Sequence, residues 1–86
     1  MRVLLRDHLD KLHYFNTIAQ LGSLRKAAEQ LRVSQPSLTH AIKVLEDATG
    51  TKLFHRSTKG VILTASGETL LLFSRRVFTD LDALEG

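Results

Sequence analysis

Side chains that can donate hydrogen bonds recur on one side of a short segment, about residues 35–48. At the helical step of about 100° per residue, four of them share one arc: Gln35, Thr39, His40 and Lys43. The opposite arc, about 120° wide, is apolar, as in a helix that packs on a core. It holds Leu38, Ala41, Ile42, Leu45 and Ala48. Amide and imidazole groups pair with base edges and ammonium groups with phosphates. The spacing therefore predicts a helix that presents its polar face to the DNA major groove.

The N-terminal half of this helix is the end that we expect to approach DNA. Glu46 and Asp47 also lie on the polar side, but at the C-terminal end, where phosphates would repel them. Ser34 is a favourable N-cap. Pro36 is tolerated because the N–H groups of a first helical turn have no intrahelical partner. Gly50 can take the left-handed conformation that ends a helix.

Two shorter helices must hold this polar face in place. Apolar residues at helical spacing predict one helix over 9–21, ended by Gly22, and a second over 24–31, capped by Ser23. Residues 32–33 form the tight turn into the third helix, which gives a helix-turn-helix. The apolar positions are Leu12, Phe15 and Ala19 in the first helix, with Ile18 at the edge, and Leu24, Ala27, Ala28 and Leu31 in the second.

The period changes to that of strands after residue 50. Residues 52–56 and 61–64 form two short runs that flank a polar turn over 57–60, which ends in glycine. Three helices followed by two strands predict a winged helix-turn-helix. We therefore expect a mainly α-helical fold, with a winged helix-turn-helix DNA-binding domain over 1–64.

A long linker helix is expected over 65–86, with Thr64 as its N-cap. Its apolar residues offer more surface than a body of under about 60 residues can cover. Leu70, Val77 and Leu84 are seven residues apart, the repeat of a coiled-coil seam. A helix from a second copy is the favoured cover, and folding back on its own body is the alternative. The expected dimer interface comprises Leu70, Phe73, Val77, Leu81 and Leu84.

Length and composition exclude several classes of protein. The 86 residues contain no cysteine, which excludes disulfides and thiolate metal sites. The four histidines show no i, i+4 pair, so we expect no metal and no cofactor. No Gly-flanked nucleophile occurs and the body is too small for a substrate pocket, so we expect no enzyme. The lack of a long apolar run indicates a soluble, cytoplasmic protein with no membrane contact.

Positive charge is concentrated in the helix-turn-helix and the wing. Residues 23–59 carry seven Lys or Arg against three Asp or Glu, a net +4, whereas residues 61–86 carry two against four, a net −2. A nucleic-acid-binding face predicts such an excess. On charge alone, an ordinary solvated surface is an equal alternative.

From about Leu9 to Leu72 the chain resembles the N-terminal DNA-binding domain of LysR-type transcriptional regulators. The resemblance rests on many short segments in order and in register: residues 12–15, 22–24, 27–31, 33–39, 42–46, 50, 53–56 and 63–67. It implies a homodimer that binds double-stranded DNA, followed by a C-terminal domain that senses a small-molecule effector. That domain is absent from these 86 residues, so we expect a fragment.

The residues and the resemblance together give the expected DNA contacts. Major-groove contacts are expected from Gln35, Pro36, Ser37, Thr39 and His40. Contacts to the DNA backbone are expected from Ser23, Arg25, Lys26, Ser34 and Lys43, and contacts near the minor groove from Arg56 and Lys59 in the wing. The alternatives are that Ser34 is only a cap and that the cations only solubilise the surface.

His40 departs from the family pattern, in which an arginine usually follows a serine. Arginine can donate twice to guanine O6 and N7, whereas a neutral histidine offers one donor and one acceptor. The family's usual base preference at this position is therefore open. The alternative function is a winged helix that binds protein partners without DNA. The polar arc of residues 35–43 disfavours it, because protein interfaces favour aromatic and aliphatic side chains.

Overall fold

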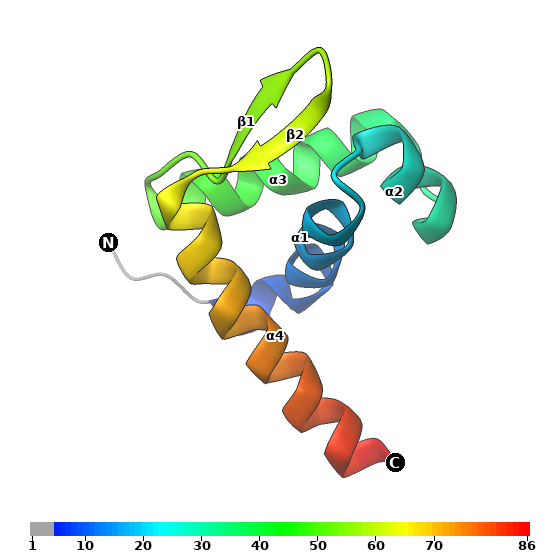
Figure 1. Cartoon of the computed structure of the whole chain (residues 1–86). Helices are drawn as coiled ribbons and strands as arrows, with labels where there is room; N and C mark the ends of the chain where they lie inside the picture. Colours follow the sequence, from blue (N-terminus) through cyan, green and yellow to red (C-terminus); the bar gives the residue numbers. More distant parts are fainter. Residues whose placement is uncertain (1–4) are drawn as a thin grey trace.

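The computed structural model describes residues 5–86 and the side chains of residues 7–86. A short 3₁₀ turn, Leu5–His8, leads into the first helix. The elements that follow are α1 (Leu9–Leu21), α2 (Leu24–Leu31), α3 (Gln35–Thr49), β1 (Phe54–Ser57), β2 (Gly60–Leu63) and α4 (Ala65–Glu85). Helix α1 contacts each of the other three helices, and the β1–β2 hairpin stands beside α3 (Figure 1). The expected winged helix-turn-helix is therefore confirmed.

The helix ends follow from local hydrogen bonds that the sequence predicted. The hydroxyl groups of Ser23, Ser34 and Thr64 each accept a backbone N–H from the first turn of α2, α3 and α4. Gly22 and Gly50 end α1 and α3 in the left-handed conformation, with φ of 67° and 72°. Because each end is specified within a few residues, these boundaries were predictable from the sequence.

The core is built around one face of α1. Leu12, Phe15 and Ile18 are fully buried there, against residues of α3, α4 and the loop before β1. The expectation that Ala19 lies on the buried face and Ile18 at its edge was wrong: Ile18 is buried and Ala19 is only half-buried. The reason is that α3 and α4 cover α1 as well as α2 does. The buried face of α1 is therefore wider than the predicted one and is centred on different residues.

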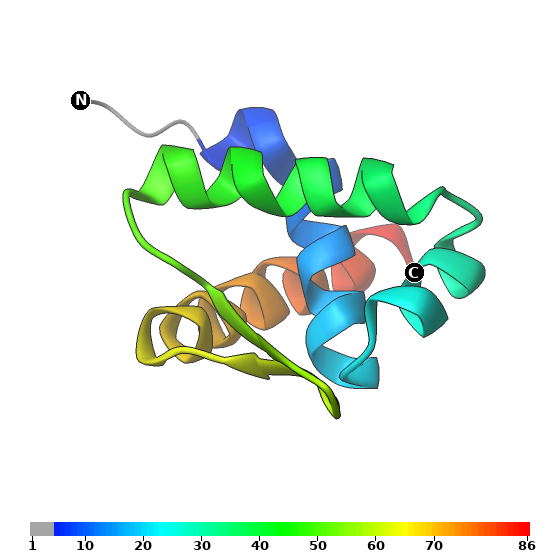
Figure 2. The ribbon, with the colours of Figure 1, turned by 90° about the horizontal axis from the view of Figure 1, so that it is seen from above.

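The wing is a two-stranded antiparallel sheet whose register pairs Phe54 with Leu63 and Ser57 with Gly60. The first strand, β1, begins two residues later than predicted, because the carbonyl groups of Lys52 and Leu53 are hydrogen-bonded to Thr64 and do not pair with β2. The Thr64 hydroxyl donates to the Lys52 carbonyl (2.6 Å), and the Thr64 N–H donates to the Leu53 carbonyl (3.0 Å). From above, the hairpin reaches from the end of α3 toward the turn between α1 and α2 (Figure 2).

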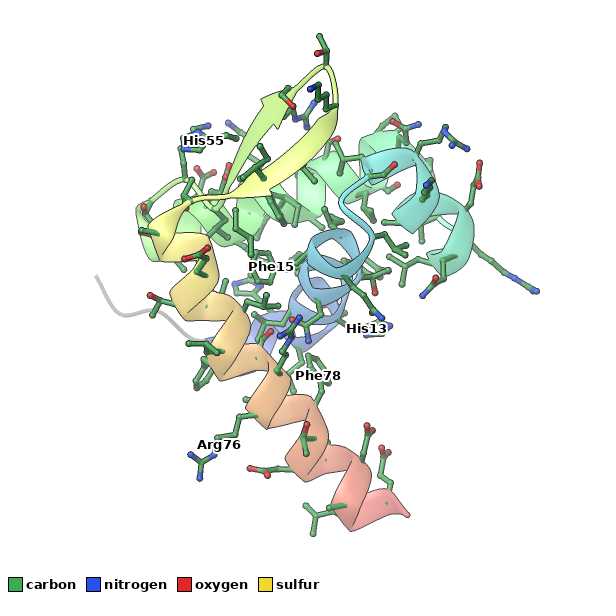
Figure 3. All side chains as sticks on the ribbon, viewed as in Figure 1. His13, Phe15, His55, Arg76 and Phe78 are labelled. Atoms are coloured by element: carbon green, nitrogen blue, oxygen red, sulfur yellow. The ribbon has the colours of Figure 1, made fainter. Side chains whose placement is uncertain are left out.

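The two halves of α4 have different surroundings. In the first half, Ser74 is fully buried and its hydroxyl is hydrogen-bonded to the Asn16 side chain of α1. The Phe78 ring packs against His13, with ring centroids 5.8 Å apart (Figure 3). Beyond Phe78 the helix projects from the body, and Leu84 is 84% exposed. No helix in the described part of the chain is long and apolar enough to cross a membrane.

Leu70 requires a correction. We expected it in a dimer interface, but it is only 8% exposed and belongs to the core of its own chain. The alternative, that the last helix folds back on its own body, therefore holds for the first half of α4. The seven-residue repeat did not reveal this, because a residue at such a position is equally suited to an intramolecular contact.

Candidate nucleic-acid interface

Helix α3 has the two faces that the sequence predicted. Leu38, Ala41, Ile42 and Leu45 are buried, and Ala48 is half-buried. Six candidates for DNA contact line the other side: Gln35, Pro36, Ser37, His40 and Lys43 are exposed, and Thr39 is half-buried. The structure therefore brings the major-groove candidates together on one accessible surface, the N-terminal half of α3.

Ser34 and Ser37 form a small hydrogen-bonded cap at the start of α3. The Ser34 hydroxyl accepts the Ser37 N–H (3.1 Å) and donates to the Ser37 hydroxyl oxygen (2.8 Å). The Ser37 hydroxyl hydrogen is thereby directed away from Ser34. The helix N-terminus adds a positive end of the helix dipole, which favours a phosphate nearby.

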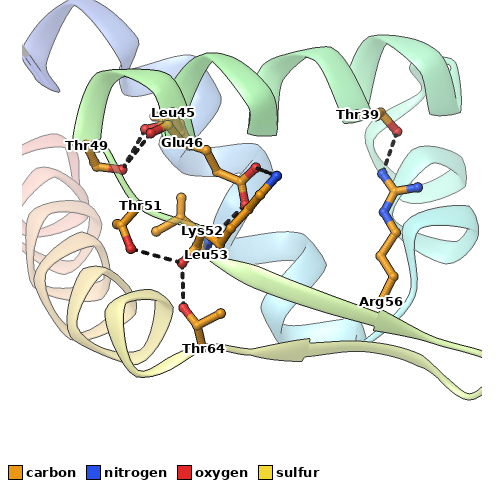
Figure 4. A network of polar contacts seen from close by, with 9 residues as sticks. All are labelled: Thr39, Leu45, Glu46, Thr49, Thr51, Lys52, Leu53, Arg56 and Thr64. Atoms are coloured by element: carbon orange, nitrogen blue, oxygen red, sulfur yellow. Dashed lines mark hydrogen bonds and ion pairs between the residues drawn. The ribbon is translucent and has the colours of Figure 1, made fainter.

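A groove of about 530 Å³ separates α3 from the wing. Four basic side chains line it, with Lys43 on α3, Lys52 in the connecting loop, and His55 and Arg56 on β1, together with one carboxylate, that of Glu46. The Arg56 guanidinium donates from Nη2 to the Thr39 hydroxyl (3.3 Å), which draws it toward α3 (Figure 4). The other guanidinium N–H groups stay available for an anion in this groove.

Glu46 was misjudged from the sequence, which placed it on the outward face. Its side chain is only 14% exposed, and its Oε2 accepts the Leu53 N–H at 2.8 Å (Figure 4). Its Oε1 lies 3.7 Å from Lys52 Nζ. One signal was present in the sequence: an acidic residue in the last turn of a helix opposes the helix dipole and so needs a partner.

The remaining basic candidates lie at the edges of this surface. Arg25 forms an exposed ion pair with Glu29 (2.8 Å) on the same helix, so part of its charge is compensated. Lys26 and Lys59 are exposed, at the start of α2 and the tip of the wing. Ser23 is half-buried and caps α2. Within the described residues, no group of three or more His, Asp or Glu side chains is arranged to hold a metal ion.

Three helices, a two-stranded wing and a polar face on the third helix define a winged helix-turn-helix domain. The family described as bacterial regulatory helix-turn-helix protein, lysR family, matches residues 9–68, and the chain belongs to this family. It is 40% identical to the uncharacterized HTH-type transcriptional regulator YkuM of Bacillus subtilis, over 91% of the chain. It is 44% identical to YdcI of Escherichia coli, over 92% of the chain. The chain spans only 29% and 25% of the length of these relatives.

Solved structures of LysR regulators share the fold. The DNA-binding domain of CbnR, solved in complex with DNA, superposes with a TM-score of 0.83 at 35% identity, covering 90% of this chain and 88% of that one. The DNA-binding domain of BenM, solved in complex with the catB site 1 DNA, gives a TM-score of 0.84 at 29% identity. That superposition covers 88% of this chain and 85% of the BenM domain.

Proposed function

We propose that this chain is the DNA-binding part of a bacterial transcriptional regulator and that it binds double-stranded DNA sequence-specifically. The observation that carries the proposal is the polar, exposed N-terminal half of α3, which stands beside a groove lined by four basic side chains. The two related domains solved with DNA support it, since they have the same fold and superpose on most of this chain. The proposed role is regulatory and not enzymatic, and it places the protein on bacterial DNA.

In this proposal, base reading and backbone binding fall to different side chains. Gln35, Thr39 and His40 read base edges in the major groove, while Pro36 and Ser37 pack against it. Phosphates are bound by Lys43 and by residues at the helix starts, namely Ser23, Arg25, Lys26 and Ser34. Lys59, at the wing tip, approaches the minor groove. The bond to Thr39 favours a role for Arg56 at the phosphates between the two grooves instead of in the minor groove itself.

Dimerisation through α4 is part of the same proposal. We take residues 1–64 as the DNA-binding domain and residues 65–86 as the linker helix, although the first half of α4 also packs on α1. Phe73 is 49% and Leu84 is 84% exposed, and Val77 and Leu81 are half-buried between them. An exposed apolar stripe of this kind is more stable when a second copy of the chain covers it than when it faces water. An effector would act through a further domain, as the resemblance implies.

Binding measured at several salt concentrations tests the proposal. A duplex that carries the preferred site should bind with log K falling linearly against log salt, because phosphate contacts release counterions. Gln35→Ala should cost about 1–3 kcal/mol on that site and relax the preference at one base pair. Lys43→Ala should weaken all duplexes by similar factors. A flat salt dependence would favour the alternative, a protein-interaction module. An equal effect of Gln35→Ala on random DNA would contradict its base-reading role.

A further inference from the structure

The Glu46 carboxylate, in the last turn of α3, is hydrogen-bonded to the base of the wing, and Arg56 forms a second link from β1 to Thr39 of α3. Glu46 Oε2 accepts the N–H of Leu53, the residue before β1, at 2.8 Å. The side chain of Glu46 is 14% exposed, so this bond is largely shielded from water, whereas Lys52 is 80% exposed and adds little as an ion pair. The hydrogen bond, and not the charge pair, is therefore the main link that Glu46 provides.

The same segment is held from the other side by α4. The Thr64 N–H donates to the Leu53 carbonyl, and the Thr64 hydroxyl donates to the Lys52 carbonyl (Figure 4). Leu53 is thus bonded through its N–H to α3 and through its carbonyl to the start of α4. With its side chain 1% exposed in the core, this residue fixes where the wing leaves the body.

A fixed exit point matters because the grooves of a duplex have a preferred width and spacing, and changing them costs free energy. A helix in the major groove and a wing near the adjacent minor groove must straddle the backbone that separates the two grooves. The distance between α3 and the wing must therefore match the duplex. A carboxylate near a phosphate backbone costs binding energy by repulsion, so its charge alone gives Glu46 no useful role in binding DNA.

We propose that Glu46 is a positioning residue for DNA binding: by accepting the Leu53 N–H, it holds the wing at the spacing from α3 that a duplex requires. The proposal rests on the proposed DNA-binding function. In this proposal the hydrogen bond of Glu46 strengthens DNA binding, whereas its negative charge weakens it. Removing the hydrogen-bond acceptor weakens binding, whereas removing only the negative charge does not.

Four single variants of the chain separate these effects. Glu46→Gln keeps an acceptor oxygen and loses the charge, whereas Glu46→Met keeps the bulk of the side chain and loses both. Glu46→Ala removes the packing as well. Asp47→Ala is the matched control, because it removes the same charge one residue away from an exposed side chain. Affinity for one duplex is measured by fluorescence anisotropy at a temperature where circular dichroism shows each variant folded.

We expect Glu46→Met and Glu46→Ala to bind about tenfold more weakly, a change of about 1.4 kcal/mol in the free energy of binding. Glu46→Gln and Asp47→Ala should bind as tightly as the wild type or slightly tighter. The Met variant keeps the test valid if the Ala variant does not fold. Lys59→Ala supplies the second readout: its cost should be smaller in the Glu46→Met background than in the wild type, since a wing whose base has shifted contacts DNA less well.

Equal binding by Glu46→Met and Asp47→Ala would overturn the proposal, because the carboxylate would then act only as a charge. An undiminished cost of Lys59→Ala in the Glu46→Met background would also overturn it, because Glu46 would then support the fold without placing the wing. If the wild type itself shows no salt-dependent binding to any duplex, the proposed function fails first. That result is distinct from a wild type that binds and a Glu46→Met variant that binds equally well.

Discussion

Gly67, in the first turn of α4, is a position where a single methyl group should destabilise the protein. A Cβ built on Gly67 would lie well within 3.0 Å of the Leu53 carbonyl oxygen, 2.9 Å from Leu63 Cδ2 and 3.1 Å from the Leu53 carbonyl carbon. Two of these three atoms belong to the backbone and have no rotamer by which to move away. The Leu53 carbonyl also accepts the Thr64 N–H, so moving it weakens that bond.

The expected magnitude is the difference between two opposing effects. Within a helix, Gly→Ala ordinarily stabilises by about 1 kcal/mol. Overpacking a filled site costs about 1–3 kcal/mol and occasionally more, and a clash with backbone belongs at the upper end. For Gly67→Ala we therefore expect a net loss of about 2 kcal/mol in the free energy of unfolding. In a domain of this size that corresponds to a fall in Tm of about 8–16 °C.

Thermal and urea denaturation, followed by circular dichroism, measure this loss. Gly50→Ala is the matched control: its Cβ meets no atom within 4 Å, and only its φ of +72° opposes the substitution. We expect the control to lose about 1–2 kcal/mol through backbone strain alone, less than or at most equal to the loss at Gly67. An unchanged or raised Tm for Gly67→Ala would refute the reasoning, because helix propensity would then outweigh the contact with Leu53.

Two further variants test the dimer and the role of His40. Phe73→Asp combined with Leu84→Asp changes two exposed residues of α4, so the fold should persist. Sedimentation equilibrium should then show a monomer. A wild type that is already monomeric at micromolar concentration would contradict the α4 dimer. His40→Arg should bind sites with guanine at the contacted position more tightly, by about 1–3 kcal/mol, because arginine donates to both O6 and N7. Competition among duplexes that differ at that base pair measures the change. An equal gain for all four bases would assign His40 to the DNA backbone.

The features predictable from the sequence are those that a few neighbouring residues determine. Ser23, Ser34 and Thr64 cap helices through bonds to an N–H three residues away, so their positions mark the helix starts directly. The polar and apolar faces of α3 follow from the helical period alone. The wing was predicted from two short runs at strand period that flank a polar turn ending in glycine, and the family resemblance agreed with it.

The features that were missed depend on contacts between distant parts of the chain. Glu46 accepts a bond from a residue seven positions later, after the chain has reversed direction, and no local pattern encodes that bond. Leu70 has the spacing of a dimer seam, and only the packing of α4 on the core decides that it is buried. Arg56 reaches Thr39 across seventeen positions, so the sequence indicated its charge but not its direction.

The wing has one further attachment, at its far end. The Val61 N–H donates to the Gly22 carbonyl (3.2 Å) at the turn between α1 and α2, and a Cβ on Gly60 would clash with that same carbonyl. With its base held by Leu53 and its far strand held by Gly22, the wing is a fixed part of the body and not a hinged arm. If a duplex contacts both α3 and the wing, as proposed, any small mismatch between their spacing and that of its grooves must be taken up by the DNA, through bending or a change in groove width. We therefore expect base steps that deform easily to be preferred at positions that no side chain touches, so that the stiffness of the DNA contributes to the choice of site.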